Sequence, residues 1–344
     1  MISLFLPGLV AGGVYSEDQM RKSIADLLRS AGMGDKFEAK VKVSADDAGV
    51  VSIVDEGEFL IQYLLLGPEK AVDVDIVIDE KVAVRPSVDK VVIITHGWLD
   101  KSYNDWPADV AGAIGERTDP NDWLCGYFDW KGGAKVVNPV DAARYARDIA
   151  GVRLAKAVLE MVPDVKKLRH VHLVAHSAGC WAVDSAASLI AKQTDARVHI
   201  TFLDAYVPQL WAEKALGAAT AEKTGRAWAE HYYSRDITFD VTQADLSNAH
   251  NVDLTEVDRG FAQHEFPYRW YYATITGRFR KTDWEKNDKV ITKIAGVEYG
   301  FARSAEAGEK NYQKSTRLKK ANSAVKLKQP KQKNIFDIST WFKK

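Results

Sequence analysis

The sequence predicts an α/β protein with a mostly parallel central sheet and helices on both faces. From residue 90 onward, short apolar runs alternate with longer helical patterns, as in parallel strands joined by crossover helices. These runs contain few polar residues, which is typical of strands that helices cover on both faces. The chain has 344 residues, of which 46% are hydrophobic, so it also has enough apolar material for a large core.

The first 83 residues are predicted to form a helix and then mostly strands. Ser16 and Gln19 form a capping box ahead of a helix at residues 17–31, which has one apolar face. Residues 38–83 contain β-branched or apolar stretches with turn residues between them. The strands predicted in this part are residues 40–43, 49–54 and 59–65.

The alternating part of the chain supplies the buried strands and the covering helices. The predicted strands are residues 91–95, 124–128, 171–175, 198–203 and 231–234. An amphipathic helix begins near Asp141, and a helix rich in small residues begins at Ala178. The apolar stripe of the first helix consists of Tyr145, Ile149, Val152, Ala155 and Leu159. In sheets of this kind, functional groups gather at the carboxyl ends of the strands.

Charge is distributed unevenly along the chain. The formal net charge is zero, but the residues from 305 to the end include 11 Lys or Arg and only 3 Asp or Glu. We expect an N-terminal helix and strand extension (1–56), a main α/β domain (57–305) and a basic, weakly ordered tail (306–344). The tail is either a solvated extension or a segment that binds anionic lipid headgroups. Nucleic-acid binding is not expected, because no folded basic module accompanies the tail.

Cysteine content and hydropathy restrict the remaining classes. The only cysteines, Cys125 and Cys180, lie in apolar stretches, so two buried free thiols are expected and a disulfide framework is excluded. Residues 1–14 are apolar, but they lack a basic region and are too short to span a membrane. We expect a soluble or peripheral protein, and the compartment stays open.

A candidate nucleophile follows the strand at residues 171–175. The segment Ala175-His176-Ser177-Ala178-Gly179 joins this strand to a helix. Small residues flank the serine in the nucleophile elbow of the α/β-hydrolase fold, because strand and helix approach closely at this strained turn. The sequence therefore predicts that fold, with Ser177 as nucleophile and the Ala178 amide as an oxyanion donor.

An acid and a histidine follow the serine in the order that this fold requires. Asp204 comes directly after the strand at residues 198–203, at the same sheet edge, and Asp236 is the alternative acid. Among the later histidines, His264 is preferred as the general base, because it precedes an aromatic helix start on an expected loop. His250 is the alternative loop residue, whereas His231 is expected to be packed or paired inside a strand.

The loop after the strand at residues 91–95 is expected to complete the oxyanion hole. In the α/β-hydrolase fold, this loop supplies the second backbone amide. Gly97 allows the tight turn, and the Trp98 amide is the predicted donor. His96 is expected to be a buried, hydrogen-bonded support that takes no part in proton transfer.

These segments together resemble the pancreatic lipase-like family over residues 57–305. The matching segments are His96-Gly97-Trp98 with Lys101 and Trp106, Phe128-Asp129-Trp130-Lys131-Gly132-Gly133, His176-Ser177-Ala178-Gly179, Leu203-Asp204, and His264 with Tyr271-Tyr272. The resemblance favours Asp204 over Asp236, since the family places its acid after the earlier strand. Ala175 replaces a glycine of the family pattern, and the interval 237–263 shows no amphipathic lid helix. We also expect no counterpart of the family's C-terminal lipid-binding domain.

The expected function is that of a serine carboxylester hydrolase of the lipase or esterase type, acting on lipid or medium-chain esters through an acyl-serine intermediate. An acyltransferase or thioesterase on the same triad, and a non-catalytic lipid-binding protein, are the alternatives. No metal or cofactor is expected. The resemblance also favours a secreted protein. Trp98 and Trp181 are either pocket-lining or core residues, with core preferred for Trp181.

Overall fold

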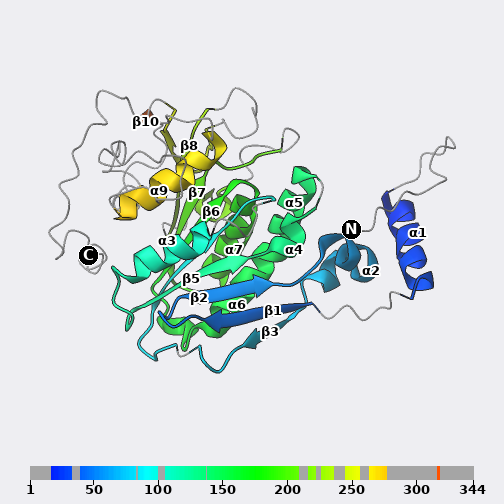
Figure 1. The fold of residues 1–344 in the computed structure, drawn as a ribbon, viewed down its shortest axis with the longest axis horizontal. Helices are drawn as coiled ribbons and strands as arrows, with labels where there is room; N and C mark the ends of the chain where they lie inside the picture. Colours follow the sequence, from blue (N-terminus) through cyan, green and yellow to red (C-terminus); the bar gives the residue numbers. More distant parts are fainter. Residues whose placement is uncertain are drawn as a thin grey trace.

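A central sheet dominates the computed structural model of the chain (Figure 1). The structure describes residues 17–32, 39–82, 84–99, 105–136, 138–208, 216–221, 226–235, 245–255, 263–276 and 316–317. Within these ranges the sheet has ten strands. Its order is β10 (Thr316–Arg317), β9 (His250–Asp253), β8 (Ala227–Tyr233), β7 (Arg197–Leu203), β6 (His170–His176), β4 (Lys90–Thr95), β5 (Trp123–Asp129), β2 (Val51–Asp55), β1 (Lys40–Ala45) and β3 (Asp75–Ile78).

The sheet is mixed but mostly parallel. Only β1 and β2 pair in the antiparallel sense among the described strands, and the other neighbouring pairs are parallel. The helices are α1 (Glu17–Ser30), α2 (Phe59–Ala71), α3 (Trp106–Gly115), α4 (Lys131–Ala134), α5 (Pro139–Tyr145), α6 (Gly151–Met161), α7 (Cys180–Gln193), α8 (Ala218–Ala221) and α9 (Phe266–Thr276). The predicted α/β class is therefore confirmed.

Helices cover the two faces of the sheet and form two cores. Figure 1 shows α3 and α9 on one side of the central strands, and α5, α6 and α7 on the other. The first core joins Trp106 and Trp270 to inward-facing residues of β4 and β8. The second, larger core joins Tyr145, Leu154 and Trp181 to the opposite side chains of the same sheet. Strands buried on both faces explain the continuous apolar runs in the sequence.

Most of the predicted elements are found, and one is wrong. The predicted helices at 17–31 and from Asp141 are α1 and the α5–α6 helix, whose two parts are joined by a π-helical turn at Ala146–Ala150. Residues 59–65, however, belong to helix α2 and not to a strand. This run is apolar throughout, so its pattern does not distinguish a buried strand from a buried helix. In the helix, Leu65 packs against Leu28 of α1 in a small buried apolar cluster.

The N-terminal strands extend the same sheet that carries the central strands. β2 pairs with β5 in parallel register, and β1 and β3 continue the sheet beyond it. Beneath them, the Arg153 guanidinium donates to an Asp55 carboxylate oxygen at 2.6 Å, and both side chains are fully buried. The Tyr145 hydroxyl donates to the other Asp55 oxygen at 2.7 Å, and Gln62 accepts from Arg153 at 2.6 Å. This buried network ties β2 and α2 to α6.

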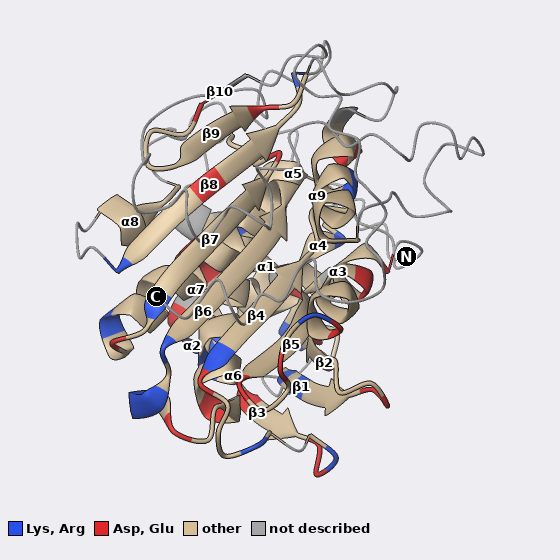
Figure 2. Cartoon of the chain, turned by 90° about the vertical axis from the view of Figure 1, so that its left-hand side faces the viewer, with Lys and Arg blue, Asp and Glu red and all other residues tan. Residues whose placement is uncertain are grey.

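Three further expectations concern the tail, the two cysteines and the helices. β10 pairs with β9, and the rest of the predicted tail lies outside the described residues. Cys125 and Cys180 are both free and buried, as predicted. No described helix is long and apolar enough to cross a membrane. Figure 2 shows charged positions on the helices, in the loops and at strand ends, and one acidic position in the middle of β8.

Candidate active site

Ser177 lies at the carboxyl end of β6, where the strand turns into helix α7. Its backbone has φ of 55°, in the left-handed region that non-glycine residues rarely adopt. Residues Ser177–Gly179 form a 3-10 turn before α7 begins. Strain of this kind persists only where surrounding contacts fix the backbone, and it is common at functional sites. The elbow predicted from the small residues around Ser177 therefore has the expected local geometry.

Two glycines allow the close approach of chain segments around this serine. A Cβ on Gly97 would lie 2.7 Å from Ser177 Cβ, and a Cβ on Gly179 would meet the carbonyl oxygen of His96. The loop after β4 and the turn after β6 are therefore in direct backbone contact. Larger side chains at either position would push the two segments apart.

Gly179→Ala is expected to lower the free energy of unfolding by about 1–3 kcal/mol, because the added methyl group overpacks a rigid backbone contact. Gly112→Ala in α3 is the matched control, since nothing lies within 4 Å of its added Cβ. The control is expected to be neutral or stabilising by up to about 1 kcal/mol. Urea unfolding measures both. Equal stability of the two variants would show that the contact at Gly179 is not tight.

Asp204 follows β7 at the same edge of the sheet, with φ of 48° and no exposed surface. Both of its carboxylate oxygens are engaged. Oδ1 accepts the Ser234 amide at 2.8 Å, and Oδ2 accepts from His264 Nδ1 at 2.6 Å. The carboxylate is thus held by backbone on one side and presented to the imidazole on the other. The alternative acid, Asp236, lies outside the described residues.

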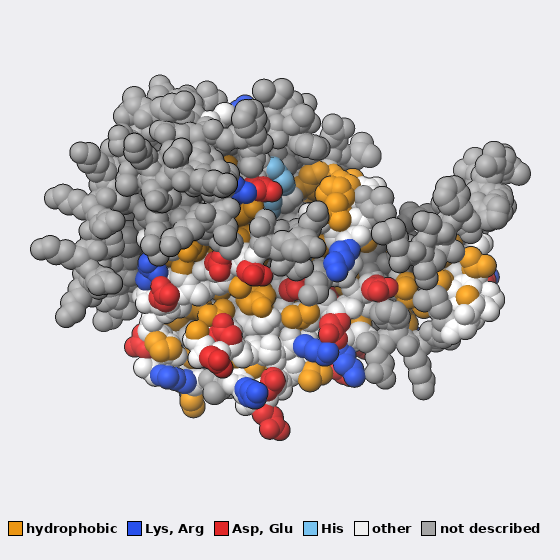
Figure 3. Space-filling model, viewed as in Figure 1, with side chains coloured by type: hydrophobic (Ala, Val, Ile, Leu, Met, Phe, Trp, Pro, Cys, Tyr) orange, Lys and Arg blue, Asp and Glu red, His pale blue; other side chains and the backbone are white. Residues whose placement is uncertain are grey.

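His264 lies on the 3-10 turn Gln263–Glu265, directly before α9. Its side chain is 36% exposed, whereas the other seven histidines of the chain are buried. In Figure 3, histidine atoms reach the surface beside a group of hydrophobic side chains. A general base has to meet both a buried nucleophile and an incoming substrate, so partial exposure suits that role.

The structure brings the three predicted residues into one hydrogen-bonded chain. Ser177 Oγ donates to His264 Nε2 at 2.9 Å, and His264 Nδ1 donates to Asp204 Oδ2 at 2.6 Å. Ser177 and His264 are separated by 87 residues in sequence, and His264 and Asp204 by 60. This arrangement can move the serine proton to the imidazole while the carboxylate fixes the tautomer.

The competing histidines have other positions. His231 is fully buried in β8, where its Nε2 accepts the Ala205 amide at 3.2 Å and its Nδ1 lies 3.2 Å from Asn251 Oδ1. The prediction of a packed, paired histidine is confirmed. His250 begins strand β9 and is buried, so its placement on a loop was wrong. It follows a polar stretch in sequence but pairs with Glu230 of β8.

The loop that carries Trp98 is tethered to the segment after β5. Trp98 Nε1 donates to the Val136 carbonyl at 2.7 Å, and the Leu99 amide donates to the Ala134 carbonyl at 3.0 Å. Leu99 has φ of 52°, which makes it the third non-glycine residue with a positive φ, after Ser177 and Asp204, in the described part of the chain. These tethers hold the loop after β4 in place at the point where Gly97 packs closely against Ser177.

His96 is buried and hydrogen-bonded and Trp181 is a core residue, as the sequence predicted. His96 is buried and stacks on Trp130 with ring centroids 5.4 Å apart. Trp130 donates its amide to His96 Nε2 at 3.2 Å and its indole N–H to the His96 carbonyl at 3.0 Å. Trp181 is buried and donates to the Tyr206 carbonyl at 2.8 Å, as a core residue. The two hydrogen bonds that Trp130 donates to His96 were not predicted, although the sequence places Trp130 directly after the strand that ends at Asp129.

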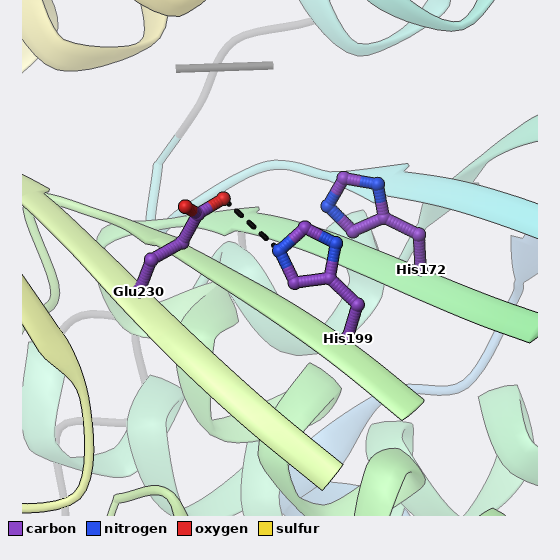
Figure 4. A group of neighbouring side chains, drawn as sticks. All are labelled: His172, His199 and Glu230. Atoms are coloured by element: carbon purple, nitrogen blue, oxygen red, sulfur yellow. Dashed lines mark hydrogen bonds and ion pairs between the residues drawn. The ribbon is translucent and has the colours of Figure 1, made fainter. Parts of the chain in front are cut away.

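A second polar cluster lies on the sheet face between β6, β7 and β8. His172, His199 and Glu230 are buried and have possible ligand atoms within 4.8 Å of one another (Figure 4). Their donor set is one that zinc accepts. However, the two imidazole rings stack 3.8 Å apart at 14°, so their lone pairs run side by side and do not converge. The geometry does not fit a shared metal ion.

Hydrogen bonds explain the same cluster. His172 Nε2 donates to Thr201 Oγ1 at 2.8 Å, and Thr201 donates to Glu230 Oε1 at 2.8 Å. His199 Nε2 lies 3.0 Å from the same carboxylate oxygen, and the Tyr232 hydroxyl donates to the other oxygen at 2.8 Å. A buried carboxylate with three donors needs no further partner. Alternating positions in β6 and β7 could have indicated that these side chains share a face.

Acidification is expected to destabilise the protein through its buried histidines. Burial lowers the pKa of His170 and His172 well below 6.5 and that of His231 to about 4. The unfolded chain binds these protons first, so stability present above pH 6.5 is lost as the pH falls below it, by about 1.4 kcal/mol per pH unit and histidine. Asp184 offsets one histidine, because burial raises its pKa to about 7. Urea midpoints that stay constant from about pH 7.5 to 5 would contradict this expectation.

In comparisons with known proteins, no family model and no curated protein matches the chain.

Proposed function

We propose that the chain is a serine carboxylester hydrolase, with Ser177 as nucleophile, His264 as general base and acid, and Asp204 as the residue that orients His264. One observation carries the proposal: His264 forms hydrogen bonds to both of the other side chains. This constellation activates serine on several unrelated folds and is recognised by its geometry.

The α/β-hydrolase fold is part of this proposal. It is supported by the positive φ of Ser177 between β6 and α7, and by the chain order of serine, acid and histidine. The positions of Asp204 after β7 and of the Gly97 loop after β4 also agree with it. The resemblance to the pancreatic lipase-like family rests on these same segments.

Acylation is the first half-reaction. Ser177 Oγ attacks the ester carbonyl carbon while its proton moves to His264 Nε2. The buried Asp204 carboxylate, accepting His264 Nδ1–H at 2.6 Å, stabilises the imidazolium. His264 then gives the proton to the leaving alkoxide, the ester C–O bond breaks, and an acyl-Ser177 remains.

Deacylation repeats these steps with water. His264 takes a proton from water as the water oxygen attacks the acyl carbon, and Ser177 leaves with that proton. In both steps the carbonyl oxygen gains negative charge, and in this proposal the Trp98 and Ala178 amides donate hydrogen bonds to it. Donors that are already fixed stabilise such charge without reorganisation. The tethers of the Trp98 loop to Val136 and Ala134 are consistent with that role.

Lipid or medium-chain carboxylic esters are the proposed substrates. Leu99 is 47% exposed directly after Trp98, which suits an apolar acyl group beside the serine. An anionic membrane surface, bound through the basic tail, is the proposed partner. A panel of esters from soluble to micellar tests the substrate class, and product analysis with an added alcohol distinguishes hydrolysis from acyl transfer.

Asp204→Asn is expected to lower kcat by about 10³–10⁴-fold, because the amide no longer fixes the imidazole tautomer. Asparagine tolerates a positive φ, so the backbone at this position is expected to be unchanged. Asp195→Asn is the matched control, since that carboxylate is fully exposed and pairs only with Arg226 among the contacts found. Hydrolysis of p-nitrophenyl esters measures both, and similar kcat values for the two variants would remove Asp204 from the proposal.

A further inference from the structure

His176 precedes Ser177 and contacts the proposed base directly. Its Nε2 lies 2.7 Å from the backbone carbonyl oxygen of His264, across 88 residues of sequence. A carbonyl only accepts, so His176 carries its proton on Nε2 and donates. The two imidazole rings also lie 4.5 Å apart at 44°. One residue thus joins the end of β6 to the turn that carries His264.

The ring of His176 is itself held on two sides. Trp106 of α3 and Tyr268 of α9 stack on each other 4.7 Å apart. Each also makes a T-shaped contact with the His176 ring, with centroids 6.2 Å apart for Trp106 and 5.0 Å apart for Tyr268. His176 is 5% exposed, so it has little freedom to change rotamer. The turn at His264 is therefore anchored to a rigid, buried group and not to a mobile surface side chain.

The other nitrogen of the ring faces the loop of the proposed oxyanion hole. A Cβ added to Gly97 would lie 3.2 Å from His176 Nδ1. This nitrogen has no hydrogen-bond partner within the described part of the chain. A bare acceptor nitrogen is the one expected when Nε2 holds the proton. Burial lowers the pKa of His176 well below 6.5, which keeps this neutral form.

We propose that His176 is a positioning residue that sets the place of His264 relative to Ser177. The inference rests on the proposed function, because it assigns the hydrogen bond to the His264 carbonyl a role in that reaction. Ser177 is covalently next to His176, Gly97 packs on its ring, and His264 is bonded to it. The buried His176 side chain is therefore connected to the nucleophile, the base and the loop of the proposed oxyanion hole.

Three substitutions in the full chain separate the hydrogen bond from packing. His176→Gln places an amide N–H near the Nε2 position and keeps the bond. His176→Asn is polar but too short to reach the His264 carbonyl, and His176→Leu fills space without a donor. Melting temperatures show which variants fold, and the Gln and Asn pair decides the question if the Leu variant does not fold.

For p-nitrophenyl acetate, Asn and Leu variants are expected to lose about 10–100-fold in kcat with KM changed by less than about twofold, since displacement of a catalytic group by about 1 Å has effects of this size. The Gln variant is expected to stay within about fivefold of wild type. Equal losses in the Gln and Asn variants, or no loss in Asn, would overturn the proposal.

A second readout does not depend on turnover. The proton between His264 Nδ1 and Asp204 is expected to give a low-field NMR signal in wild type and His176→Gln, and to exchange rapidly in His176→Asn. A signal that is unchanged in the Asn variant would contradict the positioning role. If wild type hydrolyses no ester, the proposed function fails, while this signal still tests the position of His264.

Discussion

Ser177→Ala is expected to reduce ester hydrolysis by at least about 10⁴-fold in kcat, because no other group can form the acyl-enzyme. Only the oxygen that donates to His264 at 2.9 Å is removed. The Cβ stays, and Ala at φ of 55° carries the same backbone strain as Ser, so stability is expected to change little. The measurement is kcat for p-nitrophenyl esters, together with the melting temperature.

An exposed serine provides the matched control for this variant. Ser44 lies on β1 with its side chain at the surface, so Ser44→Ala is expected to keep wild-type activity. A Ser177→Ala protein that folds and hydrolyses esters at the rate of Ser44→Ala would exclude Ser177 as the nucleophile. A water molecule activated by His264 would then be the nucleophile to test.

Arg153→Met is expected to lower the free energy of unfolding by about 3–5 kcal/mol, because it leaves the Asp55 carboxylate buried without its cation. Both side chains of this pair are fully buried and joined at 2.6 Å. Tyr145 and Gln62 then also lose a partner in the same network. Urea unfolding measures the effect.

Lys42→Met is the control for an ion pair in solvent. Lys42 and Glu56 pair at 2.9 Å, but their side chains are 56% and 45% exposed. Such pairs contribute about 0–1 kcal/mol, so this variant is expected to be close to wild type. If Arg153→Met costs no more than Lys42→Met, the buried network does not hold β2 and α2 in place. If Arg153→Met has the expected effect, removal of residues 1–56, which include Asp55, is also expected to destabilise the main domain.

The central strands could be predicted because burial on both faces leaves a simple record in the sequence. Val91–Thr95, for example, is a continuous apolar run and is buried throughout as part of β4. Ser177 could be predicted because the close approach of strand and helix requires small neighbours, and Gly179 meets that requirement against His96. Chain order allowed Asp204 or Asp236 as the acid and His264 or His250 as the base. The family resemblance favoured Asp204, and the aromatic helix start after His264 favoured that histidine.

Other features depend on contacts between residues that are distant in sequence, so local sequence patterns do not predict them. The run at residues 59–65 forms helix α2, in which Gln62 bonds to Arg153 and Leu65 packs against α1. These partners are distant in sequence, so a local sequence pattern does not show them. Arg153 is one of three charged residues in α6, and its partner Asp55 lies 98 residues away, so the sequence did not show that this charge is buried and paired. His176 was noticed as part of the elbow, but its bond to His264 required the tertiary structure.

Covalent labelling of Ser177 tests the central claim most directly. A fluorophosphonate reacts with a serine that a neighbouring imidazole activates, and it needs no knowledge of the natural substrate. Incubation of the full chain, followed by peptide mass spectrometry, is expected to find the adduct on Ser177, with none in Ser177→Ala and slow labelling in Asp204→Asn. A folded wild-type protein that stays unlabelled, or an adduct on another serine, would contradict the assignment of Ser177, His264 and Asp204 as a catalytic triad.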